Sequence, residues 1–344
     1  MDIKVIHKDF RLNGQAFNRE GLIELASNWS TSPEEYLVDF AHLILQWFND
    51  EDYVIQYTSG TTGPPKPIQL KKEAMLHSAQ GTASFFNIKD KSKALLCMST
   101  KFVGGKLMFI RSVLCGWHLD VIKPTATPLA ENKQYYDFVA MVPMQVENSI
   151  KELANVGTLI IGGAKVNATL TKQLSNVSTR VYETYGMTET ITHIAAKRIG
   201  DTSFSILPNI QITTDNRGCL VIHASYIVKE PIVTNDLVNL LDDSHFEWLG
   251  RVDNVINSGG VKLFPEQIEN KLAPFIPWRF FIAGKEDDYF GNKVVLVIES
   301  KPYDLPINAF DQLTKFEKPK EIQFVDQFVE TASGKVLRKE NIKK

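Results

Sequence analysis

Cysteine is scarce in this chain. Its 344 residues include only Cys97, Cys115 and Cys219. An odd number of cysteines without close spacing predicts neither a disulfide framework nor a zinc site. We therefore expect all three to be buried as small apolar side chains.

An excess of charge of either sign is also lacking. The chain carries 38 Lys and Arg against 40 Asp and Glu, which leaves a net charge of −2. This balance argues against a nucleic-acid partner and against a polybasic membrane binder, because neither phosphates nor anionic lipids would meet a strong opposing field.

Long hydrophobic runs are missing too. No apolar stretch approaches the roughly 20 residues that span a bilayer, and the first ten residues lack the pattern of a signal peptide. We therefore expect a cytoplasmic protein with no membrane span.

Short apolar or β-branched runs alternate with amphipathic stretches over the first two hundred residues. This alternation predicts an α/β fold with a largely parallel sheet. Buried strands are expected at 53–56, 94–98, 119–122, 138–142, 158–161 and 179–182, and helices at 74–86 and 105–114.

The pattern changes after about residue 200. Shorter strands separated by turn signals predict a small β subdomain, and the end of the chain reads as a second α+β unit. We expect a large domain over 1–250 and a small mobile domain over 251–344, with the seam near 250–254. The elements expected in this part are strands at 206–213, 219–223, 232–234, 294–298 and 322–325 and a helix at 267–272.

A stretch rich in hydroxyls and glycine follows the strand at 53–56. Its sequence over 57–66 is YTSGTTGPPK. Glycine lets successive backbone N–H groups point into one concavity, and the hydroxyls and Lys66 add donors, which suits a polyphosphate. It is not a Walker A loop, because Pro65 and Pro67 flank Lys66 where that pattern needs glycine and a hydroxyl residue.

Four further segments follow this loop in order along the chain. Together the five resemble the signature motifs of the adenylate-forming superfamily, which includes acyl- and aryl-CoA synthetases. Several motifs in the correct order are more specific than any single one. They are 57–66, 182–190 (YETYGMTET), 234–236 (TND), 250–269 (with GRVDN, SGGVK and PEQIE) and 333–338 (SGKVLR).

The resemblance implies an AMP-forming acid–thiol ligase that uses ATP, Mg²⁺ and coenzyme A. A substrate carboxylate attacks the α-phosphorus of ATP, and the acyl group then passes to the thiol of CoA. Because both reactants of the first step are anionic, the site must neutralise charge.

The phosphates are assigned by the same resemblance. Glu189 is expected to bind Mg²⁺, a hard cation that takes oxygen ligands, and Thr188 to contact the α-phosphate. The β- and γ-phosphates are assigned to Thr58, Ser59, Gly60, Thr61, Thr62, Gly63 and Lys66.

The nucleoside is assigned, also by resemblance, to residues from four segments. Tyr185, followed by Gly186, is expected to stack on adenine, and Gly163 and Ala164 to approach it at a strand end. Asp236 is expected to accept hydrogen bonds from the ribose hydroxyls, with Arg251 beside it. Asn235 stands where the family usually has glycine, which weakens the expected turn geometry.

The small domain carries the remaining assignments. By resemblance, Lys335 bridges the attacking carboxylate and the α-phosphate, although charge alone would favour a solvated basic tail there. Asp253 is expected to be the hinge between the two steps. The backbone at Gly259 and Gly260 is expected to lie close to the thiol-bearing arm of CoA. The alternative is that these glycines form a turn without a function.

The segment 99–111 indicates which class of carboxylic acid the protein activates. It contains no aspartate to balance the ammonium group of an amino acid, which would cost heavily in a buried site. Lys106 and Arg111 are instead suited to binding a second carboxylate group of the substrate. Arg111 is the better candidate, because its planar guanidinium can form two parallel hydrogen bonds with a carboxylate.

Arg111 with the following Cys-Gly-Trp is similar to the o-succinylbenzoate:CoA ligases of menaquinone biosynthesis, a group within the superfamily. Arg111 and Thr192 are assigned to the distal carboxylate, and Pro143 to the pocket wall. His193 is a further candidate, with a satisfied core histidine as the alternative. A broader aryl- or acyl-CoA ligase and a non-catalytic nucleotide-binding module remain as alternatives.

The stretch before the phosphate loop is short for this superfamily. Residues 1–52 are expected to form a short strand and two helices. We therefore expect a minimal member with less wall around its acyl pocket, for which a homodimer partner is a candidate cover.

Overall fold

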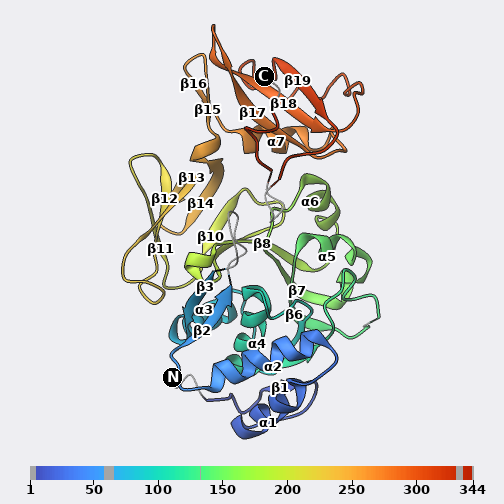
Figure 1. The fold of residues 1–344 in the computed structure, drawn as a ribbon, viewed down its shortest axis with the longest axis vertical. Helices are drawn as coiled ribbons and strands as arrows, with labels where there is room; N and C mark the ends of the chain where they lie inside the picture. Colours follow the sequence, from blue (N-terminus) through green and yellow to red (C-terminus); the bar gives the residue numbers. More distant parts are fainter. Residues whose placement is uncertain (1–4, 58–65, 132, 331–335, 343–344) are drawn as a thin grey trace.

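The computed structural model describes residues 5–57, 66–131, 133–330 and 336–342. It has a large lower part built on one long sheet and a smaller part that follows the sheet's last strand in sequence (Figure 1). No helix within the described ranges combines the length and apolar character needed to cross a membrane.

A sheet of twelve strands lies at the centre of the large part. Neighbouring strands from β1 to β8 run parallel, and those from β8 onward pair antiparallel. Their spatial order is β1 (Arg11–Leu12), β5 (His118–Val121), β4 (Lys93–Leu96), β6 (Tyr136–Met141), β7 (Val156–Ile161), β8 (Arg180–Gly186), β9 (His193–Arg198), β10 (Ser203–Ile206), β14 (His245–Arg251), β13 (Ile232–Asp242), β12 (Cys219–His223) and β11 (Gln211–Thr214).

Two hydrophobic cores cover opposite faces of the parallel half. Successive strand residues point to opposite faces, so Phe138 joins one core and Val139 the other. The first core holds α1 (Arg19–Trp29), α2 (Glu35–Phe48), α3 (Lys72–Phe85) and α4 (Val103–Cys115), and the second holds α5 (Pro143–Glu147), the 3₁₀ turn η1 (Ile150–Asn155) and α6 (Ala168–Leu174). The predicted α/β fold with a parallel-rich sheet is confirmed.

The strand expected at 53–56 forms, but it does not belong to the parallel sheet as predicted. It exists as β2 (Tyr53–Tyr57), but it pairs antiparallel with β3 (Pro67–Lys71) in a separate two-stranded sheet. Only alternate residues of β2, Val54 and Gln56, are buried, whereas a central parallel strand is covered on both faces.

Strands also form where the small β subdomain was expected. They are not a separate sheet, because β10 to β14 extend the parallel sheet through the antiparallel pair β9–β10. Cys97 and Cys219 are buried as expected, whereas Cys115 is only half-buried.

The end of the chain forms three small elements after the 3₁₀ turn η3 (Val252–Asn254). A hairpin of β15 (Ile256–Ser258) and β16 (Val261–Leu263) leads into α7 (Pro265–Leu272), whose buried Ile268 and Leu272 are four residues apart on one face. The third element is a sheet in the order β17 (Phe280–Asp287), β18 (Gly291–Glu299) and β19 (Glu321–Val325).

Candidate active site

A cavity of about 870 Å³ opens at the carboxyl ends of the parallel strands. Ligands of open α/β sheets bind at this edge, because the loops that follow parallel strands converge there. The lining comes from the ends of β4, β6, β7 and β8 and includes Ser99, Val142, Gly163, Ala164 and Thr188.

Arg111 reaches this cavity from α4 and is 2 % exposed. Its Nη2 donates to Thr192 Oγ1 at 3.3 Å, its Nη1 lies 3.8 Å from the sulfur of Met108, and its buried Nε has no partner. Burial lowers the pKa of Arg111 to about 10, which still leaves it charged at neutral pH. No carboxylate within the described ranges forms an ion pair with it.

The start of α4 explains how Arg111 is placed there. A Cβ on Gly105 would clash with the carbonyl oxygen of Ser99, so only glycine lets the first turn of the helix approach the end of β4 this closely. Lys106, the other cation expected near the acid, does not line this cavity. Its Nζ donates to the carbonyl of Thr100 at 2.8 Å, and burial lowers its pKa.

Thr192 and His193 connect Arg111 to helix α3. The Thr82 hydroxyl donates to the carbonyl of Ser78 at 2.9 Å and lies 3.3 Å from His193 Nε2, and His193 Nδ1 lies 3.3 Å from Thr192 Oγ1. Since the proton of Thr82 is already used, Nε2 is assigned as the donor and Nδ1 as the acceptor.

The protonation of His193 agrees with this direction. Burial, and then the charge of Arg111, holds its pKa well below the usual value, so the ring is neutral. The Thr192 hydroxyl can therefore donate to His193 and accept from Arg111. Sequence reasoning missed Thr82, and no local pattern could have found it, because it lies 111 residues before His193.

Thr188 and Glu189 follow β8 in the 3₁₀ turn η2 (Thr188–Thr190), and both are exposed. Thr188 lines the cavity, and Glu189 is the next residue along the chain. An accessible carboxylate and hydroxyl form an oxygen donor set that suits a Mg²⁺ ion bound together with phosphates.

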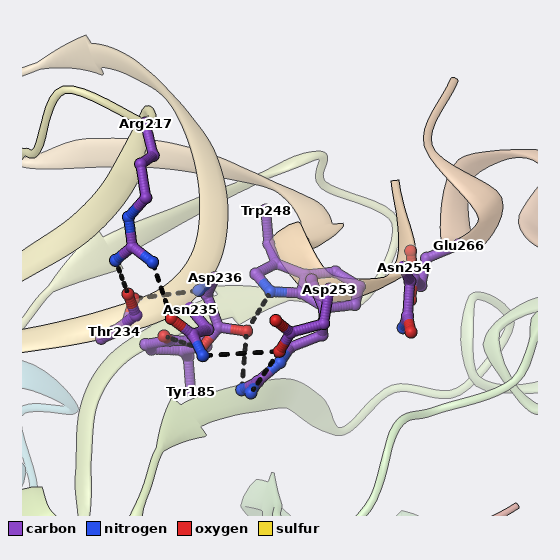
Figure 2. Close-up of polar contacts among 10 residues, drawn as sticks. Tyr185, Arg217, Thr234, Asn235, Asp236, Trp248, Asp253, Asn254 and Glu266 are labelled. Carbon is purple, nitrogen blue, oxygen red and sulfur yellow. Dashed lines mark hydrogen bonds and ion pairs between the residues drawn. The ribbon is translucent and has the colours of Figure 1, made fainter. Parts of the chain in front are cut away.

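Asp236 lies at the centre of a second polar cluster, on β13 (Figure 2). One of its oxygens accepts from the Tyr185 hydroxyl at 2.8 Å and the other from Trp248 Nε1 at 3.1 Å, while Arg251 lies 3.6 Å away. The register of β13 and β14 sets Asp236 opposite Arg251. Sequence reasoning missed Trp248, which no motif singled out.

The ring of Tyr185 is fixed by aromatic neighbours. It packs against Phe204 at 5.8 Å and Phe246 at 5.4 Å between ring centroids. Burial, with a further contribution from Asp236, raises the pKa of its hydroxyl, which therefore remains a donor. The phenol orients the carboxylate of Asp236.

Asn235 joins this cluster to the expected hinge. Its side chain accepts from Arg217 at 3.0 Å and donates to Asp253 at 3.4 Å (Figure 2). Asp253 lies in η3 with its side chain 64 % exposed, 3.7 Å from Arg251. Asn235, which stands where glycine is usual, therefore contacts the residue expected to be the hinge.

The comparisons with known proteins agree with this geometry. The sequence pattern of the AMP-binding enzyme family matches residues 24–222, more than half of the chain. The chain belongs to the AMP-binding enzyme family. The predicted adenylate-forming recognition and the AMP-forming acid–thiol ligase class are thereby confirmed.

Named relatives of this AMP-binding enzyme include two 2-succinylbenzoate–CoA ligases. That of Oceanobacillus iheyensis is 24% identical over 84% of this chain and 69% of its own length, and that of Staphylococcus aureus is 24% identical over 98% and 76%.

Solved structures share the fold. An acyl-CoA synthetase (AMP-forming)/AMP-acid ligase II-like protein of Dyadobacter fermentans is 34% identical, with a TM-score of 0.64 over 92% of this chain and 97% of that one. The o-succinylbenzoate coenzyme A synthetase of Bacillus subtilis in complex with AMP is 21% identical, with a TM-score of 0.71 over 84% and 69%.

Other expected site residues of the AMP-binding enzyme lie elsewhere. Pro143 starts α5, and its neighbours Val142 and Met144 line the cavity while Pro143 does not. Gly259 and Gly260, with φ of 56° and 80°, form the turn between β15 and β16, where Gly259 N–H donates to the carbonyl of Phe290 at 2.9 Å. Neither glycine lines the cavity.

Several expected residues cannot be placed. Thr58, Ser59, Gly60, Thr61, Thr62, Gly63 and Lys335 lie outside the described residues. Lys66 is described and exposed directly before β3. Near the end of the chain, Arg338 pairs with Glu269 of α7 at 2.7 Å.

Proposed function

We propose that this AMP-binding enzyme activates 2-succinylbenzoate with ATP and transfers the acyl group to coenzyme A, as in menaquinone biosynthesis. A carboxylate oxygen attacks the α-phosphorus of ATP, the bond to the bridging β-oxygen breaks, and pyrophosphate leaves. The CoA thiolate then attacks the acyl carbon, and AMP leaves. The succinylbenzoate ligases among its relatives support this choice of substrate.

The observation that carries the proposal is the buried guanidinium of Arg111. A buried charge without an opposite charge beside it costs several kcal/mol, and a carboxylate that forms two parallel hydrogen bonds with it offsets that cost. A dicarboxylate can supply one carboxylate for activation and leave the other for Arg111. Thr192 supports Arg111 as an acceptor, and His193 acts through Thr192.

ATP is proposed to lie between this cavity and the cluster around Asp236. Asp236, oriented by Tyr185 and Trp248, would accept from the ribose hydroxyls, with Arg251 beside it. Glu189 would hold Mg²⁺, which neutralises phosphate charge when bound, and Thr188 would contact the α-phosphate. Gly163 and Ala164 would border the adenine.

The chain segments 1–250 and 251–344 are proposed to act as a large binding domain and a mobile lid. Rotation about Asp253 would bring Lys335 to the adenylation step and the turn at Gly259–Gly260 to the thioester step. In the described conformation α7 contacts the large part through Gln267, which donates to the carbonyls of Trp248 at 2.9 Å and Leu249 at 3.2 Å.

A pyrophosphate-release assay over a panel of acids, with and without CoA, tests the proposal. We expect 2-succinylbenzoate to give a kcat/KM at least about tenfold above benzoate, aliphatic monocarboxylates and amino acids, with thioester formed only when CoA is present. Equal rates for mono- and dicarboxylates would contradict the substrate assignment while leaving the ligase class intact.

A second candidate is a ligase of broader acyl or aryl specificity. The 34% identity to the Dyadobacter fermentans acyl-CoA synthetase-like protein over 97% of that chain favours it. The same panel separates the two, because a broad ligase accepts monocarboxylates as readily as the dicarboxylate. A panel in which no acid releases pyrophosphate would favour a non-catalytic module.

A further inference from the structure

A strained turn joins the two halves of the proposed site. Ile191 has φ of 63° and ψ of −46° and is 5 % exposed. Positive φ is a genuine outlier for a β-branched residue, because Cβ crowds the following backbone. The Thr192 N–H donates to the Thr190 carbonyl at 2.6 Å, which closes a three-residue turn of a rare and strained type.

This turn lies between residues with different tasks. Glu189, proposed for magnesium, comes two residues before Ile191, and Thr192, which contacts Arg111, comes directly after it. Backbone strain persists only where the surrounding structure holds it, and it concentrates at functional sites. The question is which contacts hold this turn.

The hydroxyl of Thr190 supplies these contacts. The side chain is fully buried, and its oxygen accepts from the Met187 N–H at 2.9 Å. Its single proton is shared between the carbonyls of Met187 at 2.9 Å and Thr192 at 2.7 Å. One hydroxyl thus connects the backbone on both sides of Glu189 and Ile191.

The neighbouring strand prevents the turn from shifting. A Cβ on Gly186 would clash with the Thr192 carbonyl oxygen and with the Cα of His193, so β8 and the turn are already in direct backbone contact. The ladder between β8 and β9 also changes register at Tyr185 and Gly186. The turn is therefore held by close packing on one side and by Thr190 within.

We propose that Thr190 is a positioning residue that sets the separation between the magnesium-binding carboxylate of Glu189 and the acid-binding pair of Thr192 and Arg111. The inference rests on the proposed function. Without the hydroxyl, the strained turn relaxes and the separation between Glu189 and Thr192 changes, which affects magnesium binding and acid binding alike.

A graded series of variants tests this role. Thr190→Ser keeps the hydroxyl, Thr190→Cys offers only a weak donor and acceptor, and Thr190→Val keeps the shape without hydrogen bonding. The matched control is Thr179→Val, because Thr179 is also buried and its hydroxyl donates to a backbone carbonyl, that of Leu153, before the opposite end of β8.

We expect Thr190→Val to raise both the KM for the acid and the Mg²⁺ concentration for half-maximal activity by about tenfold, since a buried backbone donor and acceptor lose their partner. Both values should be intermediate in Thr190→Cys, and in Thr190→Ser they should stay within about twofold of wild type. Thr179→Val should lower Tm without changing either concentration.

The outcomes separate the inference from the proposed function. If Thr190→Val, or Thr190→Cys where valine prevents folding, lowers Tm but leaves both concentrations unchanged, the positioning role is overturned. If Arg111→Leu does not raise the KM for dicarboxylates, the substrate assignment is overturned instead. The magnesium requirement, measured with any acid the enzyme accepts, still reports on Thr190 in that case.

Discussion

The proposed acid end and the proposed nucleotide end of the site are built differently. At the proposed acid end, Arg111, His193 and Thr82 are buried side chains from α4, β9 and α3, and hydrogen bonds link them through Thr192. At the proposed nucleotide end, the side chains of Arg251 and Asp253 are 41% and 64% exposed, and the two residues are close to each other in sequence. Breaking a buried polar contact costs more than breaking an exposed one.

The difference suits two different tasks. A buried arrangement holds one geometry and can select one substrate, whereas weak exposed contacts can exchange as a domain rotates. Asp236 is intermediate between the two, because it is buried but lies one residue after Asn235, which contacts the proposed hinge residue Asp253.

The largest expected effect is at the acid end. Arg111→Leu should raise the KM for the succinylbenzoate substrate by about 100-fold, since a charged hydrogen-bonding partner is worth roughly 1.5–3 kcal/mol. The KM for a monocarboxylate should not rise. Ser112→Ala is the control, because this neighbouring buried hydroxyl donates to the carbonyl of Met108 within α4. Equal changes for both acids would remove the distinction between the two ends.

At the nucleotide end, Asp236→Asn should raise the KM for ATP by about tenfold, because the amide nitrogen cannot accept from the Tyr185 hydroxyl or from a ribose hydroxyl. The KM for the acid should be unchanged. Asp242→Asn removes the same charge from the far end of β13 and serves as the control. An increase in the acid KM instead would show that the two ends are not separable.

The buried histidine predicts a pH dependence of stability. The folded-state pKa of His193 is depressed below the usual value, so below about pH 6.5 the unfolded chain binds a proton that the folded chain does not. This lowers the free energy of unfolding as pH falls, by up to about 1.4 kcal/mol per pH unit.

Urea unfolding between pH 7.5 and 5 measures this effect. His193→Gln should show a smaller loss of stability over that interval than wild type, and His42→Gln, at an exposed histidine, should match wild type. A wild-type slope retained in His193→Gln would contradict a neutral, buried ring at the acid end.

The smallest effect is expected at the proposed hinge. Asn235→Gly removes exposed hydrogen bonds to Arg217 and Asp253, and such contacts contribute about 0–1 kcal/mol. We expect the ratio of the adenylation and thioester rates to change by about twofold, with the acid KM unchanged. Asn239→Gly removes a similarly exposed contact to Glu247 between β13 and β14 and should not change that ratio. No change in Asn235→Gly would count against its contact with the hinge.

Much of the fold was predictable from the sequence. Helices α3 and α4 and strands β6, β7 and β18 form where apolar periodicity indicated them, because that pattern reflects local burial. Which strands pair with each other was harder to predict from the sequence. The run at 53–56 reads like its neighbours, yet β2 pairs with β3, because the choice of partner depends on contacts distant in sequence.

The site divides in the same way. Asp236 and Arg251 were predicted from motifs within short segments, and the strand register places them opposite each other. Thr82 and Trp248 were not found, because their roles depend on which side chains face them across the fold.

The sequence by itself determined the adenylate-forming family, the α/β class and the residue types of the chemistry, because motifs and periodicity are properties of neighbouring residues. Only the tertiary structure decided that Arg111 lacks a carboxylate partner among the described residues, that His193 is neutral, and that Ile191 is held in a strained turn. Burial, hydrogen-bond direction and backbone strain each depend on groups that packing brings together from distant parts of the chain.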